Sequence, residues 1–190
     1  ERKLLSETAG TPYQTMFAIG LYTGLRPNEY KTAYIENGFI VANNSKRKNG
    51  KVELKKIPIT PMLKPYLEGT TELYFTRLEQ IRHKFNGILP NHKLYDLRTT
   101  FYTRCMECGV AEVATKTFAG HSLGGLADTY TDLGDDFLKA EGEKFSYWFY
   151  AQLYAQLLRK KAYFLPYSTV FEGLPRGGKY AEIFRIFSYK

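Results

Sequence analysis

The sequence predicts a mainly α-helical domain that carries a small antiparallel β-sheet, an α+β fold. Apolar residues recur at helical spacing in several segments separated by glycine or proline. Two short segments, residues 39–42 and 52–59, are strand-like and flank Asn49-Gly50, the strongest two-residue signal for a β-hairpin. With 190 residues, of which 44% are hydrophobic, the chain is long enough to bury a core.

The helices are predicted in chain order from their apolar spacing and their start and stop residues. The first covers residues 11–22 and stops near Gly24. Pro27 fits the first turn of a short second helix, which places Arg26 at the point where that helix begins. After the hairpin, further helices are predicted from Pro61 onward, over residues 72–85, over 94–108, over 111–118 and around Tyr130.

Composition changes near Tyr147. Residues 147–190 hold 13 of the 30 aromatic residues, and they carry seven basic against two acidic side chains. We therefore expect one domain over residues 1–146 and a C-terminal extension over residues 147–190. An aromatic extension of this kind more often packs into a core or contacts a partner than stacks on nucleic-acid bases.

Charge and cysteine content restrict the partners of the chain. A formal net charge of +8 and a pI of about 9.3 fit a polyanionic partner. Cys105 and Cys108 have no second pair of metal ligands beside them, so we expect no zinc site and a reducing compartment. No signal peptide and no apolar run of roughly 20 residues is present, so we expect a soluble, cytoplasmic protein without a membrane partner.

Four side chains with complementary chemistry stand at defined intervals. Arg98 precedes His121 by 23 residues, His121 precedes Tyr130 by 9, and Arg26 lies upstream. Guanidinium groups can bind the non-bridging oxygens of a phosphodiester, where charge builds in the transition state. A tyrosine can attack the phosphorus and keep the bond energy in a phosphotyrosine. The pattern predicts cleavage and rejoining of a phosphodiester by Tyr130, with no metal or other cofactor.

The sequences around these residues resemble the catalytic domain of the tyrosine recombinase (phage integrase) family. The resemblance covers roughly residues 4–146 and rests on T-G-L-R-P-N-E, Y-D-L-R-T-T-F, A-G-H-S and T-Y-T-D. It implies that Arg26 and Arg98 clamp the scissile phosphate, that His121 braces it, and that Tyr130 forms a 3′-phosphotyrosine resolved by strand exchange.

The resemblance also implies a biological setting. The protein would be a site-specific DNA recombinase or integrase from a bacterial or viral mobile element, associated with DNA. It would work as a homotetramer on duplex DNA, with a C-terminal element docking between neighbours. An N-terminal DNA-clamping domain of the family is not part of the 190 residues, so we expect weak binding to the target site.

By the same resemblance, a lysine of the hairpin serves as the general acid. We assign this role to Lys46, and Lys48 and Lys51 remain alternatives. The other basic residues of the hairpin are expected to contact DNA phosphates without sequence preference or to be solvated. Those expected to bind DNA are Arg47, Lys48 and Lys51, and Lys55 and Lys56 complete the basic run.

One motif departs from the family pattern, which usually has a histidine where this chain has Tyr95. A phenol can donate a hydrogen bond to phosphate but is a poor base near neutral pH. We expect Tyr95 to act as a donor, with compensation by His92 as the alternative. Three other interpretations stay open: a type IB topoisomerase that religates the original strand, a catalytically inactive DNA-binding relative, and a weak surface ion pair between Arg26 and Glu29.

Overall fold

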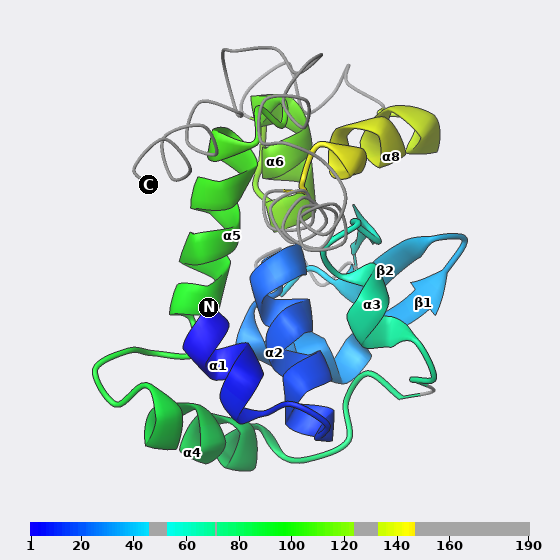
Figure 1. Cartoon of the computed structure of the whole chain (residues 1–190). Helices are drawn as coiled ribbons and strands as arrows, with labels where there is room; N and C mark the ends of the chain where they lie inside the picture. Colours follow the sequence, from blue (N-terminus) through cyan, green and yellow to red (C-terminus); the bar gives the residue numbers. More distant parts are fainter. Residues whose placement is uncertain (46–52, 71, 124–132, 147–190) are drawn as a thin grey trace, which may run out of the picture. The chain divides into compact units, whose positions relative to one another are not determined.

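The computed structural model describes residues 1–45, 53–70, 72–123 and 133–146. This part of the chain is mainly helical and contains one three-stranded antiparallel sheet, which confirms the predicted fold class (Figure 1). None of its helices is both long and apolar enough to cross a membrane. Residues 147–190 lie outside the described residues, so their separation as an extension stays a prediction.

The described elements are named as in Figure 1. The helices are α1 (Arg2–Glu7), α2 (Pro12–Thr23), the 3₁₀ helix η1 (Pro27–Thr32), α3 (Lys64–Leu67), α4 (Leu78–Ile88), α5 (Asp96–Glu107), α6 (Glu112–Ala119) and α8 (Asp135–Glu143). The strands are β1 (Tyr34–Glu36), β2 (Phe39–Asn43) and β3 (Leu54–Pro58).

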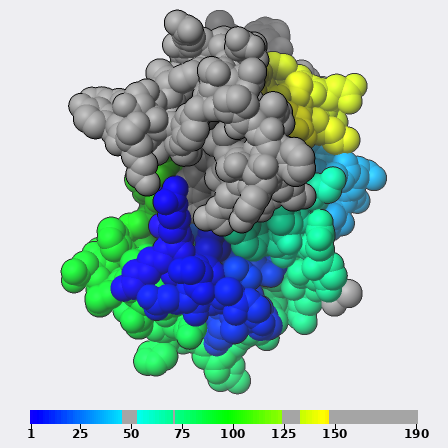
Figure 2. Space-filling view, viewed as in Figure 1, coloured from blue at the N-terminus to red at the C-terminus, as the bar shows by residue number. Residues whose placement is uncertain are grey.

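Helix α2 forms the centre of the core and confirms the helix predicted over residues 11–22. Every residue from Met16 to Thr23 is buried. The helix contacts α1, α3 and α5, which surround it in Figure 1. A helix that is apolar on all sides must be covered on all sides. Figure 2 shows the α1 segment (blue) at the surface of the face drawn. Arg2 and Lys3 of this helix are exposed.

A glycine lets α5 and η1 approach α2 closely. A Cβ atom at Gly20 would collide with Tyr30 Oη and would come within 2.8 Å of Leu97 Cδ1. Leu97 precedes Arg98 on α5, and Tyr30 lies on the short helix that follows Arg26. The close packing at Gly20 therefore fixes the distance between the two elements that carry the predicted arginines.

The sheet confirms the predicted hairpin and adds a strand to it. Strands β2 and β3 pair antiparallel from Phe39 opposite Pro58 to Asn43 opposite Leu54. Strand β1, which was not predicted from the sequence pattern, pairs with the other edge of β2. The turn of the hairpin, residues 46–52, lies outside the described residues.

Two predicted helices begin later than expected. The helix predicted over residues 72–85 begins at Leu78, because the apolar stripe that packs against the core starts there. Leu73 is also buried, but it lies in an irregular segment. The helix predicted from Pro61 begins at Lys64 as the short α3.

Helices α5 and α6 position three predicted site residues: Tyr95 directly precedes α5, Arg98 lies on it, and His121 follows the end of α6. Helices α5 and α6 confirm the helices predicted over residues 94–108 and 111–118, within two residues at each end. Helix α8 was not predicted, and it packs with α6 against β3. Helices α5 and α6 also contact each other, and Arg98 on α5 donates to Ala119 at the end of α6. Asn44, which follows β2, donates to Gly120 just after α6.

Candidate functional site

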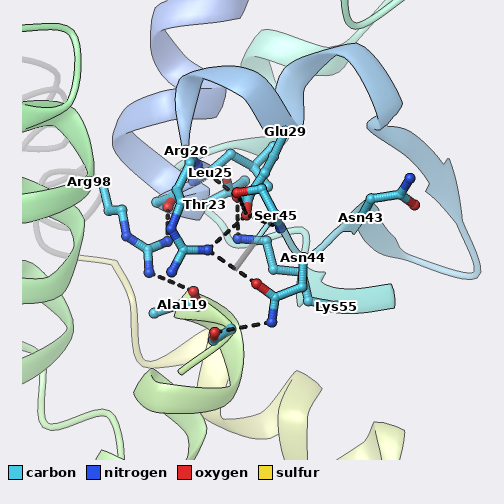
Figure 3. Close-up of polar contacts among 12 residues, drawn as sticks. Thr23, Leu25, Arg26, Glu29, Asn43, Asn44, Ser45, Lys55, Arg98 and Ala119 are labelled. Carbon is cyan, nitrogen blue, oxygen red and sulfur yellow. Dashed lines mark hydrogen bonds and ion pairs between the residues drawn. The ribbon is translucent and has the colours of Figure 1, made fainter. Parts of the chain in front are cut away.

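The first predicted arginine lies between α2 and η1. Gly24 has a left-handed backbone with φ of 61°, which ends α2, and Pro27 then begins η1. Arg26 is the residue before that helix, and its side chain is only 9% exposed. Its Nη1 donates to Glu29 Oε1 at 2.8 Å and to Asn44 Oδ1 at 3.2 Å (Figure 3). Its buried Nε and Nη2 have no hydrogen-bond partner in the described part of the chain.

Glu29 is the acceptor around which this cluster is built. Its Oε2 accepts from the Arg26 backbone N–H at 2.7 Å, and its Oε1 accepts from Ser45 N and Oγ, both at 3.1 Å. Lys55 Nζ lies 2.6 Å from Oε2. Burial alone would raise the pKa of Glu29, but Lys55 and the donors on Arg26 and Ser45 lower it to about 2. The Arg26–Glu29 pair is therefore buried and structural, and the interpretation as a weak surface pair is wrong.

The expectation that Lys55 is solvated is also wrong. Its side chain is 3% exposed, whereas that of the neighbouring Lys56 is 46% exposed, because successive side chains of β3 point to opposite faces. Burial lowers the pKa of Lys55 to about 8, Glu29 opposes this change, and repulsion by Arg98 and Arg26 adds to it. Three cations thus surround one carboxylate, and with all four groups ionised the cluster keeps a net charge of +2.

The second predicted arginine points into the same cluster from α5. Arg98 is 4% exposed. It donates from Nη1 to Gly24 O and from Nη2 to Ala119 O, each at 2.6 Å (Figure 3). These carbonyls belong to the ends of α2 and α6, where backbone acceptors lack helical partners. Burial and then repulsion by Arg26 lower the pKa of Arg98. No carboxylate in the described part of the chain forms an ion pair with Arg98.

His121 follows directly on the end of α6. Gly120 ends that helix with φ of 64°. His121 is exposed, and its Nε2 lies 2.9 Å from Arg98 Nη2. Arginine can only donate, so this contact requires Nε2 as the acceptor and places the ring hydrogen on Nδ1. The ring also lies 5.9 Å from the Tyr102 ring at an interplanar angle of 36°.

Asn44 joins the two halves of the cluster. Its Oδ1 accepts from Arg26 Nη1 at 3.2 Å, and its Nδ2 donates to Gly120 O at 3.1 Å (Figure 3). One amide therefore links the first arginine to the turn that precedes His121. A Cβ at Gly120 would lie 2.9 Å from Asn44 Nδ2, so the glycine is needed for both its φ and this approach.

Tyr95 and His92 lie at the start of α5. Tyr95 is 47% exposed and is the residue before the helix. It is near enough to Arg98 to offset part of the lowering of that arginine's pKa. His92 Nδ1 lies 3.3 Å from Asp96 Oδ2, with both side chains largely exposed. Tyr95 thus borders the cluster, while His92 has a partner on its own segment.

The structure brings together Arg26, Arg98 and His121, with Tyr95 beside them. The other predicted site residues lie outside the described residues, and their assignments stay predictions: Lys46, Arg47, Lys48, Lys51 and Tyr130. Within the described ranges, no three or more His, Cys, Asp or Glu side chains gather in a way that could hold a metal ion.

The overall fold is similar to that of a known protein. The structure is similar to that of an integrase from mycobacterium phage Brujita, with a TM-score of 0.60 over 76% of this chain and 15% sequence identity. The fold is that of a phage integrase. This chain spans 55% of the phage protein's length. The integrase of transposon Tn1549, solved in complex with circular intermediate DNA, matches at a TM-score of 0.47 and 20% sequence identity. The match covers 75% of this chain and 62% of the transposon integrase chain. No protein-family model and no curated protein matches the sequence.

The places of three residues in this cluster were not predicted from the sequence. Glu29 lies three residues after Arg26, a spacing that signals a pair but not its burial. Asn44 carries no sequence signal, because its role depends on the end of α6, 76 residues away. Lys55 belongs to a run of basic residues, a pattern that usually indicates a solvated surface.

Proposed function

We propose that this chain is the catalytic domain of a tyrosine recombinase that cleaves and rejoins DNA strands at specific sites. The observation that carries the proposal is the pair of buried arginines, Arg26 and Arg98, drawn from distant segments into one cluster with a single carboxylate. Two guanidinium groups repel each other, so an excess of positive charge this close together favours an anion between them. The integrase fold supports the same conclusion.

Arg26 has donors to offer to such an anion. Its Nη1 is occupied by Glu29 and Asn44, but Nε and Nη2 are not bonded to any described residue. Buried donors without a partner cost free energy, and a phosphodiester oxygen would remove that cost. Donors fixed in place before the reaction stabilise the charge that develops on phosphorus oxygens, because no reorganisation is needed.

In the proposed reaction, Tyr130 Oη loses its proton to water and bonds to the scissile phosphorus as the bond to O5′ breaks. Lys46 donates a proton to O5′, which leaves a 5′-hydroxyl and a 3′-phosphotyrosine. Arg26 and Arg98 hold the non-bridging oxygens. His121, with its hydrogen on Nδ1, donates a hydrogen bond to the phosphate. A 5′-hydroxyl of the partner strand then gives its proton to Lys46 and bonds to the phosphorus as the bond to Tyr130 Oη breaks. Tyr130 leaves as the phenolate and regains a proton from water.

The remaining parts of the proposal concern Tyr95 and the assembly. Tyr95 donates a hydrogen bond to the phosphate and takes no proton, because a phenol is a poor base near neutral pH. The partner is duplex DNA, which the net charge of +8 favours. The active assembly is a homotetramer on DNA, in the cytoplasm of a cell that carries the mobile element.

The proposal is tested by trapping the covalent intermediate. Duplexes from candidate recombination sites would carry a nick near the expected cleavage position, so that the short 5′-hydroxyl strand diffuses away and religation stops. The chain, a Tyr130→Phe variant and a Tyr34→Phe control would be compared on denaturing gels. Tyr34 is a partly exposed tyrosine on β1, outside the cluster. We expect an adduct with the unaltered chain and the control, and none with Tyr130→Phe.

Three other outcomes would each correct the proposal differently. DNA binding without any adduct, on a site verified by recombination, would make the chain a binding-only relative. An adduct that persists in Tyr130→Phe would assign the nucleophile to another residue. Relaxation of supercoiled plasmid without a partner site would favour a type IB topoisomerase.

A further inference from the structure

A cleft of about 620 Å³ opens beside the arginine cluster. Arg26 lies in its wall, so the cleft is continuous with the proposed catalytic site. Its volume falls in the range of ligand-binding clefts in proteins. The described residues that line it are Arg26, Pro27, Asn28, Ser45, Arg82, Asn86, Pro90, His92, Lys93, Leu94 and Tyr95.

Helix α4 supplies one wall of this cleft. Its buried residues, among them Ile81 and Phe85, pack into the core. Arg82 and Asn86, each one position further along, are both exposed and both line the cleft. Residues four apart lie on the same face of a helix. The helix therefore presents one cation and one amide to the cleft from the face that the core leaves uncovered.

The charge of the cleft has one sign. Arg26, Arg82 and Lys93 line it, and no aspartate or glutamate is among its described lining residues. Arg82 and Lys93 form no ion pair with any other described residue. The carboxylates nearest along the chain are Glu79, three residues before Arg82, and Asp96, three residues after Lys93. No ion pair joins Glu79 to Arg82 among the described residues, and Asp96 accepts from the Lys93 backbone N–H at 3.0 Å and pairs with His92. The two side-chain cations thus remain available to an anionic ligand.

A DNA strand bound at the arginine cluster brings more than one phosphate group close to the protein. Each strand carries one negative charge for about every 3.4 Å of helix axis. A strand whose phosphate lies at Arg26 therefore places further phosphates in the immediate surroundings. The cleft is the neighbouring space that has cations and amide donors and no carboxylate among its described lining residues.

We propose that Arg82 and Lys93 bind backbone phosphates of the same DNA strand, next to the phosphate held by Arg26 and Arg98. Asn86 and Asn28 add hydrogen bonds to phosphate or sugar oxygens. These contacts position the strand and carry no sequence information. The inference rests on the proposed function, and it adds a backbone subsite to the site described above.

The test measures how DNA binding depends on salt. The dissociation constant of the 190-residue chain for a fluorescent duplex of arbitrary sequence would be measured by anisotropy over a series of salt concentrations. The Arg82→Gln/Lys93→Gln variant removes both cations. The Lys64→Gln/Lys139→Gln control removes two exposed lysines that line a different cleft, beside β1, α3 and α8. An Arg82→Lys/Lys93→Arg variant exchanges the residues and keeps both charges.

Each lost phosphate contact lowers the slope of log affinity against log salt by about 0.9. We therefore expect the double glutamine variant to lose about 2 units of slope. The control and the exchanged variant should keep the slope of the unaltered chain. Thermal unfolding of all four proteins would show that the folded state is retained.

The outcomes separate this subsite from the proposed function. A covalent adduct from the unaltered chain, together with an unchanged slope in the double glutamine variant, would overturn the subsite alone. An equal loss of slope in the control would also overturn it, because the contacts would then not be local to the cleft. Absence of both adduct and DNA binding in the unaltered chain would overturn both proposals.

Discussion

Lys55 Nζ lies 2.6 Å from Glu29 Oε2, and both side chains are almost fully buried. Removing two charges from water is costly, and further hydrogen bonds to such a pair help to offset that cost. Glu29 receives these bonds from Arg26 and Ser45, whereas Lys55 Nζ has no further hydrogen-bond partner among the described residues. The pair therefore fixes the carboxylate that orients Arg26, and through it one half of the proposed phosphate site.

Replacing Glu29 by glutamine should strongly destabilise the protein. The change leaves Lys55 and Arg26 as buried cations without a carboxylate, and removal of one partner of a buried pair typically costs about 3–5 kcal/mol. Urea unfolding would measure the free energy of unfolding. Glu36→Gln, at an exposed position on β1, is the matched control and should stay within about 0.5 kcal/mol of the unaltered chain.

A double variant shows whether the loss of stability comes from the interaction between Glu29 and Lys55. Glu29→Gln/Lys55→Met removes both charges, so it should be more stable than the sum of the two single changes predicts. Strict additivity would show that Glu29 and Lys55 do not interact in the folded protein.

The buried lysine should also make stability depend on alkaline pH. The pKa of Lys55 is about 8 in the folded protein, against an ordinary value of 10.5. Between these values the unfolded chain binds more protons, so the free energy of unfolding should rise with pH, by at most about 1.4 kcal/mol per pH unit. Below pH 8 the cost of burying the charge is fully present. Urea unfolding from pH 8 to pH 10.5 measures the rise.

Two methionine variants assign that rise to its source. Lys55→Met should remove the contribution, while Lys56→Met, at the exposed neighbouring position, should keep it. The same pH dependence in all three proteins would mean that other groups produce it.

Lys55 is buried and the neighbouring Lys56 is exposed, and this alternation explains why the hydrophobic pattern of the sequence did not predict part of the site. On β3 the apolar Leu54 is 53% exposed and the charged Lys55 is 4% exposed, the reverse of the usual burial of apolar residues. This strand is fixed by its register with β2, in which Leu54 lies opposite Asn43, and by the carboxylate that receives Lys55. Neither feature can be read from the strand's own residues.

Local signals predicted other parts of the site well. The position of Arg26 followed from Gly24 and Pro27, which end one helix and begin the next in the structure too. The family resemblance implied that Arg98 and His121 belong to one site, and their side chains lie 2.9 Å apart in the structure. Their catalytic roles stay predictions. The role of Asn44 was not predicted, because its two partners, Arg26 and Gly120, come from segments that only the folded chain brings together.

Two glycines share a left-handed backbone conformation, but only one of them lies against Asn44. Replacing each by alanine separates the free-energy cost of the backbone conformation from the cost of the contact with Asn44. Gly120 has φ of 64°, and a Cβ there would lie 2.9 Å from Asn44 Nδ2. Gly109 has φ of 70°, and a Cβ there would meet nothing within 4 Å. Gly109→Ala should cost about 1–2 kcal/mol, from the left-handed backbone alone.

Gly120→Ala should cost more than Gly109→Ala, because Asn44 must also move away from Arg26. It should slow adduct formation as well, whereas Gly109→Ala should leave the rate unchanged. Urea unfolding and the adduct assay measure the two effects. Equal results for both variants would show that Asn44 does not depend on the space at Gly120.

Replacing Arg98 by lysine should reduce adduct formation while keeping the charge of the site. The guanidinium binds Gly24 O and Ala119 O together, and an ammonium group lacks the planar fork that this requires. Loss of one preorganised donor commonly costs about 100- to 1,000-fold in rate, so we expect a decrease of that order. Single-turnover adduct formation at saturating duplex measures the rate. The slope of log affinity against log salt should not change, because the charge is retained.

Arg104→Lys is the control, on the same helix at a residue paired with Glu1 and Glu107. Its rate of adduct formation should stay near that of the unaltered chain. Equal rates for the two variants would mean that Arg98 contributes only its charge.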